Sequence, residues 1–204
     1  MTANLPLVER KQRRARQRII DAARELFLER GFDRVSVGDI AERAEVGRTT
    51  FFRHFGDKQE VVFANEQELL DTIAAAHQTD GIHAAGDATE ALEQLRPILL
   101  ALCAQAAADP AAYTRHFQLI DQHPELGARD EVKMQQIADN LSDLLIYRGT
   151  SEVTARFAAQ VALACYQTAK RLGNDPHTLA DNTGEAFKWA LTLGTGNVSR
   201  SSTQ

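Results

Sequence analysis

The chain has 204 residues, of which 44% are hydrophobic and 25% are charged, as in an ordinary folded globular protein. It holds no apolar run of about 18 residues, and its charged first residues lack the apolar stretch of a secretory signal. We therefore expect no membrane span and no export, and two cysteines, Cys103 and Cys165, in such a chain fit a reducing cytoplasm.

The net charge of −5 conceals an asymmetry along the chain. Residues 1–60 hold 13 Lys and Arg against 10 Asp and Glu, a balance of +3, whereas residues 61–204 hold 10 against 18, a balance of −8. A basic N-terminal part on an acidic remainder is typical of a protein that presents one end to nucleic acid.

The first predicted helix follows a tail, residues 1–9, that we expect to be disordered. Residues 10–18, RKQRRARQR, hold six basic side chains in nine positions. Such a run can be a simple solvated surface. Because the two short helices described next form a helix-turn-helix pattern, we interpret the run as an arm for DNA phosphates or the minor groove. The helix should continue to about Arg30, where Gly31 ends it. Its apolar stripe consists of Ile19, Ala22, Ala23, Leu26 and Phe27.

Two short helices joined by a tight turn are predicted next, at about 36–44 and 48–54. Ser36 is a good N-cap and Asp39 can bond back toward it. Phe51 and Phe55 are four residues apart and should face the core together. The pattern is that of a helix-turn-helix, whose second helix enters the major groove of DNA.

The stretch from Ile40 to Lys58, IAERAEVGRTTFFRHFGDK, resembles the tetracycline-repressor (TetR) family of bacterial transcription regulators, whose pattern is roughly IAxxAGVSxGTxYxHFxxK. The close resemblance covers about residues 15–65. It implies an all-α fold of about nine helices, with a three-helix DNA-binding domain and a larger helical domain for ligand binding and dimerisation. It also implies a set of DNA-binding residues. They are Ser36, Arg48, Thr49, Thr50, Phe52, Arg53, His54 and Lys58.

Three positions depart from the family pattern. Glu45 replaces the turn glycine, so it carries some strain if the backbone there needs a positive φ. Thr49 replaces a glycine at the front of the recognition helix, and Phe52 replaces a tyrosine whose hydroxyl typically bonds a DNA phosphate. Phe52 cannot make that bond, although it can touch a thymine methyl group.

The remaining chain is predicted to be helical apart from a loop at residues 79–88. A helix opens at Asp57 and should run to about His77, linking the domains 10–56 and 57–194. Turn signals such as Asp109-Pro110 and Asp175-Pro176 separate five further helical patterns. These are expected at about 88–107, 110–122, 124–147, 152–172 and 176–193, and residues 195–204 should form a disordered tail.

The last two helices are apolar on more than one side, as helices are when they are buried or paired with another chain. The resemblance implies that they form a twofold homodimer through about residues 151–193, although an internal core position remains the alternative. A dimer would place two recognition helices on double-stranded DNA with a palindromic operator sequence.

The resemblance further implies a small-molecule effector enclosed by the C-terminal helices. Each candidate for lining that site is equally an ordinary core residue. The candidates are Leu99, Cys103, Tyr113, Phe117, Met134, Leu141 and Tyr166. Because apolar residues dominate and the sequence suggests no cationic cluster, we expect a mainly hydrophobic ligand.

The sequence holds no glycine-rich phosphate loop, no HExxH and no CxxC, so we expect no enzymatic activity, no metal and no cofactor. The leading hypothesis is a dimeric, cytoplasmic transcription regulator, a repressor that a ligand releases from DNA. Two alternatives stay open. Oxidation of Cys103 or Cys165 could replace the ligand as the switch, or the protein could be a helical enzyme with its site in the C-terminal domain.

Overall fold

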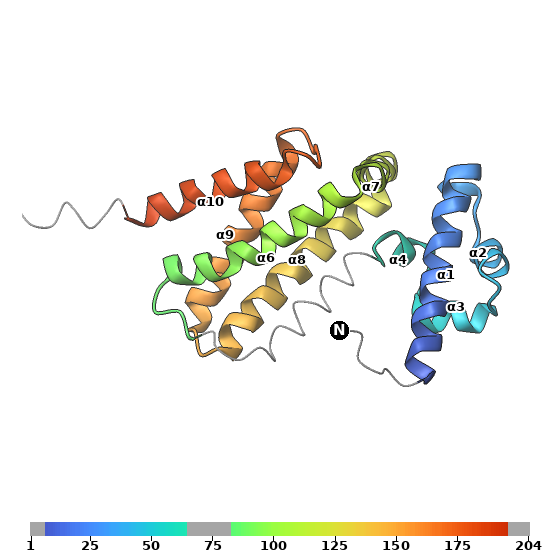
Figure 1. The fold of residues 1–204 in the computed structure, drawn as a ribbon, viewed down its shortest axis with the longest axis horizontal. Helices are drawn as coiled ribbons and strands as arrows, with labels where there is room; N and C mark the ends of the chain where they lie inside the picture. Colours follow the sequence, from blue (N-terminus) through green and yellow to red (C-terminus); the bar gives the residue numbers. More distant parts are fainter. Residues whose placement is uncertain (1–6, 65–82, 196–204) are drawn as a thin grey trace, which may run out of the picture. The chain divides into compact units, whose positions relative to one another are not determined.

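The computed structural model describes residues 7–64 and 83–195 (Figure 1). Every secondary-structure element in these two ranges is a helix, so the predicted all-α class is confirmed. The chain divides into two compact units, residues 1–67, which we call the head, and residues 68–204, which we call the body. Within the described ranges no helix combines the length and the apolarity needed to cross a membrane.

The head consists of a long helix followed along the chain by four short ones. Helix α1 starts at Leu7, within the stretch expected to be a disordered tail, and ends at Arg30 as predicted. Gly31 follows with a φ of 78°, a left-handed conformation that glycine adopts without steric cost. The other elements are η1 (Phe32–Arg34), α2 (Val37–Arg43), α3 (Arg48–His54) and α4 (Lys58–Val62).

The apolar stripe of α1 forms the centre of the head core. Ile19 and Leu26 of this stripe are at most 1% exposed, and they share one cluster with Ile40 of α2 and Phe51 of α3. Val61 of α4 belongs to the same cluster, which is why the head extends past the boundary expected at residues 56 and 57. The helix predicted to run to about His77 is described only as far as α4, and residues 65–82 lie outside the described part.

The predicted helix caps are present in the head. The Ser36 side chain accepts a hydrogen bond from the Asp39 backbone, and the Asp39 carboxylate accepts one from the Ser36 backbone at 2.8 Å. Asp57 caps α4 by accepting from the backbone of Glu60. Each cap satisfies amide groups that the first turn of a helix otherwise leaves without partners.

The turn between α2 and α3 depends on a left-handed residue at Glu45, whose φ is 52°. The Glu45 amide donates to the carbonyl of Glu42, and the Val46 amide donates to that of Ala41. These two bonds make a Schellman motif, in which glycine is the preferred residue at the left-handed position. The positive φ on which the expected strain depends is therefore present at Glu45.

The body packs five described helices around a second core (Figure 1). Leu99, Leu141, Ala162 and Phe187, one from each of four helices, are at most 1% exposed in this core. The helices are α6 (Ala88–Ala108), α7 (Pro110–Gln122), α8 (Pro124–Tyr147), α9 (Glu152–Arg171) and α10 (Leu179–Thr195).

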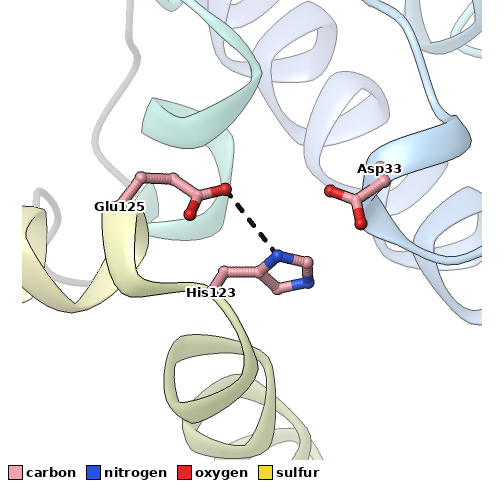
Figure 2. A group of neighbouring side chains, drawn as sticks. All are labelled: Asp33, His123 and Glu125. Carbon is pink, nitrogen blue, oxygen red and sulfur yellow. Dashed lines mark ion pairs between the residues drawn. The ribbon is translucent and has the colours of Figure 1, made fainter.

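Most junctions of the body follow the predicted signals. Asp109 caps α7 ahead of Pro110, and Ser151 caps α9. At the junction of α7 and α8, His123 Nδ1 lies 3.7 Å from a carboxylate oxygen of Glu125 (Figure 2). Asp33, drawn in the same figure, belongs to η1 of the head.

The predicted start of the last helix at Pro176 is wrong, since α10 begins at Leu179. The Asp175 side chain accepts from the amide of His177, and its carbonyl accepts from the amides of Thr178 and Leu179. The bonds from His177 and Thr178 use two amides that a helix starting at Pro176 would leave free. At its other end α10 reaches Thr195, and residues 196–204 lie outside the described part.

Replacing Glu45 by glycine should stabilise the head. An L-residue in the left-handed region costs about 1–2 kcal/mol, part of which the entropy of glycine offsets, so we expect a net gain of about 0.5–1 kcal/mol. Slower hydrogen exchange of the α2 and α3 amides in the full chain measures it. Glu45→Ala is the matched control and should give no gain, because it keeps the Cβ. An equal gain in both variants would mean that strain is not the cause.

Candidate functional site

Helix α3 turns a polar face outward and an aromatic face into the head. Phe51 is fully buried, and Phe55, which follows the helix, is 5% exposed. Phe52 is 55% exposed. Thr50 is half-buried, with its amide bonded to the Gly47 carbonyl at 2.8 Å. The side chains that remain available on the outer face are Arg48, Thr49, Phe52 and Arg53.

Arg48 lies across the first turn of α2 at Gly38. A Cβ atom added to Gly38 would come within 2.6 Å of an Arg48 guanidinium nitrogen. The guanidinium occupies this place because residue 38 has no side chain. Gly38 thereby influences where the first cation of the recognition helix is presented.

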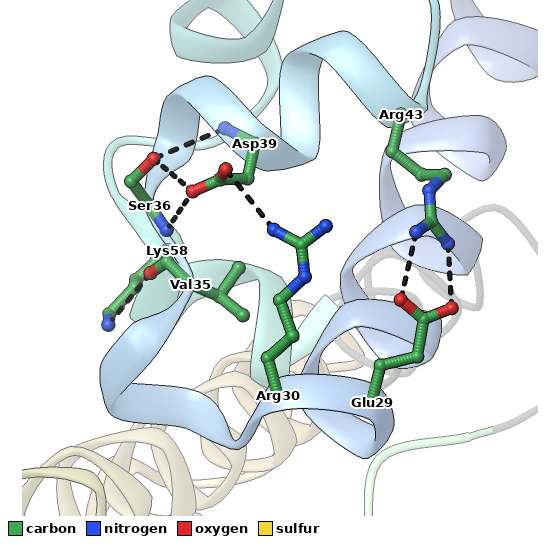
Figure 3. Close-up of polar contacts among 7 residues, drawn as sticks. All are labelled: Glu29, Arg30, Val35, Ser36, Asp39, Arg43 and Lys58. Carbon is green, nitrogen blue, oxygen red and sulfur yellow. Dashed lines mark hydrogen bonds and ion pairs between the residues drawn. The ribbon is translucent and has the colours of Figure 1, made fainter.

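The start of α2 is a compact polar cluster (Figure 3). The Ser36 hydroxyl and amide both donate to the Asp39 carboxylate, and Arg30 Nη1 lies 3.5 Å from the same group. The bonds from Ser36, and then the charge of Arg30, lower the pKa of Asp39. Ser36, a predicted DNA-binding residue, thus serves as the cap of α2 while its side chain stays at the surface.

The end of α2 is tied to α1 by a forked ion pair (Figure 3). Arg43 donates to both carboxylate oxygens of Glu29, at 3.0 and 2.9 Å, and to Glu25 at 3.1 Å. The hydrogen bond from Arg43 lowers the pKa of Glu29. Bidentate geometry of this kind fixes orientation better than a single contact does.

Lys58 turns toward the head interior. Its ammonium donates to the carbonyls of Phe32 and Val35 at 2.9 and 3.1 Å, and lies 4.2 Å from the centre of the Phe32 ring. The bond to Val35 appears in Figure 3. Two of its three donors are therefore used within the head. These bonds give Lys58 a structural role at the start of α2, while the phosphate contact expected from the sequence stays a prediction.

The basic run of α1 divides into two kinds of side chain. Arg16 turns inward, where Nη2 donates to the Ala64 carbonyl at 2.9 Å and the guanidinium lies 5.3 Å from the centre of the Phe55 ring. The rest of the run stays exposed and can face phosphates. These exposed residues are Arg10, Lys11, Arg13, Arg14 and Arg18.

His54, at the end of α3, is half-buried, and its Nε2 atom is enclosed without a hydrogen-bond partner within the described residues. Burial, and then the charges of Arg53 and Arg16, lower its pKa. The imidazole is therefore mainly neutral at neutral pH. Its contact with a DNA phosphate stays a prediction.

The predicted effector residues lie together in the body. Leu99 and Cys103 come from α6, Met134 and Leu141 from α8, and Tyr166 from α9, all within one buried cluster. Tyr113 of α7 packs against that cluster. Phe117 lies one helical turn further on, with its ring centre 4.6 Å from that of Tyr113. The sequence thus grouped these residues correctly, while any role in binding stays a prediction.

The two cysteines are buried separately within the body. Cys103 Sγ lies 3.4 Å from the Thr183 hydroxyl, and burial raises the pKa of its thiol. Burial also raises the pKa of Cys165. Both thiols are therefore poor nucleophiles, which argues against the alternative of an oxidation switch.

The sequence suggested no cationic cluster among the candidate effector residues, and the structure places a single cation, Lys170, beside two of them, Phe117 and Tyr166. The ammonium of Lys170, in the last turn of α9, lies 4.1 Å from the centre of the Phe117 ring and 3.3 Å from Asp130 of α8. Because Lys170 and Asp130 are 40 positions apart, no local pattern could reveal the pair.

Helices α9 and α10 also leave large apolar side chains in solvent. On α9, Val153 and Phe157 lie one turn apart and are 81% and 59% exposed. On α10, Trp189 and Leu193 have the same spacing and are 65% and 83% exposed. Large apolar groups gathered in this way are typical of a surface that another chain covers.

Comparisons with known proteins agree on one family. Residues 19–64 match the family described as bacterial regulatory proteins, tetR family. The chain is 27% identical over 198 residues to the HTH-type transcriptional regulator TcmR of Streptomyces glaucescens, an alignment that covers 93% of this chain and 85% of TcmR.

Two solved structures share the fold. The complex of SmeT with triclosan has a TM-score of 0.58 at 17% identity, covering 88% of this chain and 90% of SmeT, a protein of Stenotrophomonas maltophilia. The complex of FadR from Thermus thermophilus with lauroyl-CoA has a TM-score of 0.54 at 20% identity, covering 93% and 98% of the two chains. At these identities the likeness concerns the fold alone.

Acid should weaken the ties of α2. Folding lowers the pKa values of Glu29 and Asp39, so the two carboxylates contribute fully to the stability of the fold above their ordinary pKa values of 4.5 and 3.8. This contribution is lost as the pH falls through the lowered folded-state pKa values. The variant Glu29→Gln with Asp39→Asn should melt below the wild type at neutral pH, and the difference should shrink as the pH falls below the ordinary value of 3.8. The exposed change Glu42→Gln is the control; a constant difference across pH would contradict the assignment.

Removing the ammonium of Lys58 should destabilise the head without any DNA present. Lys58→Met keeps the aliphatic stem but leaves two carbonyls without their donor, so we expect a loss of about 1–3 kcal/mol. Hydrogen exchange of the α2 amides measures this loss, with the exposed Lys11→Met as the control. If the α2 amides of Lys58→Met exchanged as slowly as those of the wild type, the structural role would be contradicted and a phosphate contact would be favoured.

Proposed function

Because this chain belongs to the tetR family of bacterial regulatory proteins, we propose that it acts as a dimeric transcriptional repressor, released from a palindromic operator by a small, mainly hydrophobic molecule. The observation that carries the proposal is the outer face of α3. Arg48, Thr49, Phe52 and Arg53 are exposed there, on a helix whose other face is fixed in the head core. A rigid helix that presents cations and a hydroxyl fits the major groove.

The contacts divide into two kinds in this proposal. Arg48 and Thr49 face base edges, with Thr50 beside them, whereas Arg53 and the exposed cations of α1 lie near phosphates. Phe52 makes an apolar contact in place of the phosphate bond typical of the family. The phosphates supply most of the affinity and make it salt-dependent, and the base edges supply the sequence preference.

A dimer formed through α9 and α10 would be able to recognise a palindromic DNA site. The exposed pairs Val153 with Phe157 and Trp189 with Leu193 give each chain an apolar surface that a second copy can cover through a twofold axis. One head reaches only a few base pairs, so two heads at a fixed spacing are needed for a longer site.

The body core supports a mainly hydrophobic effector, because Leu99, Met134, Tyr166 and their neighbours form an apolar and aromatic cluster. SmeT with triclosan and FadR with lauroyl-CoA indicate that this fold can hold such ligands. For release, the ligand must bind the state that does not fit DNA more tightly than the state that does.

Selection of DNA from a random pool by the full chain, at low and moderate salt, tests the proposal. We expect one enriched palindrome, and its loss in the variant Arg48→Ala with Arg53→Ala, which leaves the body intact. Salt-sensitive binding without an enriched sequence would contradict specific recognition. A catalytic activity that survives this variant would favour the alternative of an enzyme.

Gly38 should tune operator binding through Arg48. Gly38→Ala places a methyl group against the guanidinium and should weaken binding to the selected operator by less than the approximately 1–3 kcal/mol expected for Arg48→Ala. In the Arg48→Ala background the same change should have no further effect, as a double-mutant cycle can measure.

Gly56→Ala is the matched control, because a Cβ there meets no atom within 4 Å among the described residues. Additive effects of Gly38→Ala and Arg48→Ala would mean that Gly38 does not act through the guanidinium.

A further inference from the structure

Lys170 lies in a box of aromatic rings and a carboxylate contributed by three helices of the body. Its ammonium is 3.3 Å from Asp130 Oδ2 of α8, 4.1 Å from the ring centre of Phe117 on α7 and 5.9 Å from that of Tyr166 on α9. The side chains of Lys170 and Asp130 are only 16% and 15% exposed. We call Phe117, Asp130 and Tyr166 the cation box.

The box offers more to a cation than Lys170 uses. The second carboxylate oxygen of Asp130, Oδ1, is enclosed and has no hydrogen-bond partner within the described residues. Aromatic faces carry negative potential and attract cations, and a carboxylate adds a full negative charge. The surroundings therefore favour a positive group and disfavour an anion.

The box adjoins the residues proposed to hold the effector. Tyr166 belongs to the buried cluster of the body, and the Phe117 ring lies 4.6 Å from the ring of Tyr113, which packs on that cluster. The Tyr113 hydroxyl in turn donates to Asn174, just beyond α9. A molecule with an apolar part among these residues would place a polar end at the box.

We propose that the cation box is the polar end of the effector site, that Lys170 is a displaceable occupant of it, and that the effector is a hydrophobic organic cation. This inference rests on the proposed function. A lysine ammonium is strongly hydrated and sits on a flexible stem, so on leaving the box it regains water. A quaternary ammonium group is recognised by such aromatic surroundings and has no N–H groups to satisfy.

The same geometry argues against a hydrophobic anion bound by Lys170. An anion bound to Lys170 would share the ammonium with Asp130, a carboxylate held on α8, and would lie beside that carboxylate and near two aromatic rings. Both neighbours repel negative charge. The charge of the preferred ligand therefore separates the two possibilities.

Two probes with the same chain and opposite charge test the inference. Decyltrimethylammonium and decanoate, both kept below their micelle concentrations, are titrated calorimetrically into the full-length protein. We expect tighter binding of the cation. Asp130→Asn should weaken cation binding on the order of tenfold, since it removes the charge and keeps the shape.

Lys170→Met gives the sharpest contrast, because it empties the box while keeping an apolar stem. We expect it to strengthen cation binding several-fold, whereas a site built to bind anions through Lys170 would lose decanoate. Lys170→Arg should weaken cation binding, because a planar guanidinium stacks firmly on the rings. Lys188→Met, an exposed lysine of α10, is the control.

The inference would be overturned if the Asp130→Asn and Lys170→Met variants fold correctly and bind both probes as the wild type does. Lys170 and Asp130 would then be only a structural ion pair that joins α8 to α9. The same preparations are assayed on the selected operator. A protein that binds its operator but whose box variants leave cation binding unchanged refutes the cation box alone. Box-dependent cation binding without any operator refutes the proposed repressor and retains the site.

Discussion

Helices α2 and α3 are stable because both pack against one apolar stripe of α1. Each has seven residues, and isolated helices shorter than about 12 residues are marginal in water. Their stability must come from burying Ile40 and Phe51 against Ile19 and Leu26. The exposed face of α3 is rigid for this reason, since its backbone is fixed by what lies on the opposite side.

Charged side chains also hold the segments of the head together. They include basic residues that composition alone would assign to the binding of nucleic acid. Arg16 donates to Ala64, and Lys58 donates to Phe32 and Val35, so both cations connect segments of the head. Arg43 ties the end of α2 to α1 through Glu29. A basic surface for DNA therefore has fewer free cations than the sequence count suggests, and the exposed part of α1 supplies most of them.

The sequence predicted well whatever depends on neighbours along the chain. The cap at Ser36, the end of α1 at Gly31 and the left-handed position at Glu45 each follow from a few adjacent residues. It failed where a local bond competed with a helix signal, as Asp175 does before α10, and where partners are far apart, as Lys170 and Asp130 are. The inward turn of Lys58 belongs to the second kind, because its acceptors lie 26 and 23 positions away.

The position of the cation box on α9 bears on how a ligand could act. Lys170 ties the last turn of α9 to α8, while Val153 and Phe157 near the start of the same helix form part of the proposed pairing surface. Reversing a two-state equilibrium from 1:99 to 99:1 requires about 5.5 kcal/mol of differential binding. A cation beside an aromatic face contributes about 0.5–2 kcal/mol, so two boxes in a dimer supply only part of this. The apolar remainder of the ligand must therefore contact the body differently in the two states, and the box would select which hydrophobic molecules can do so.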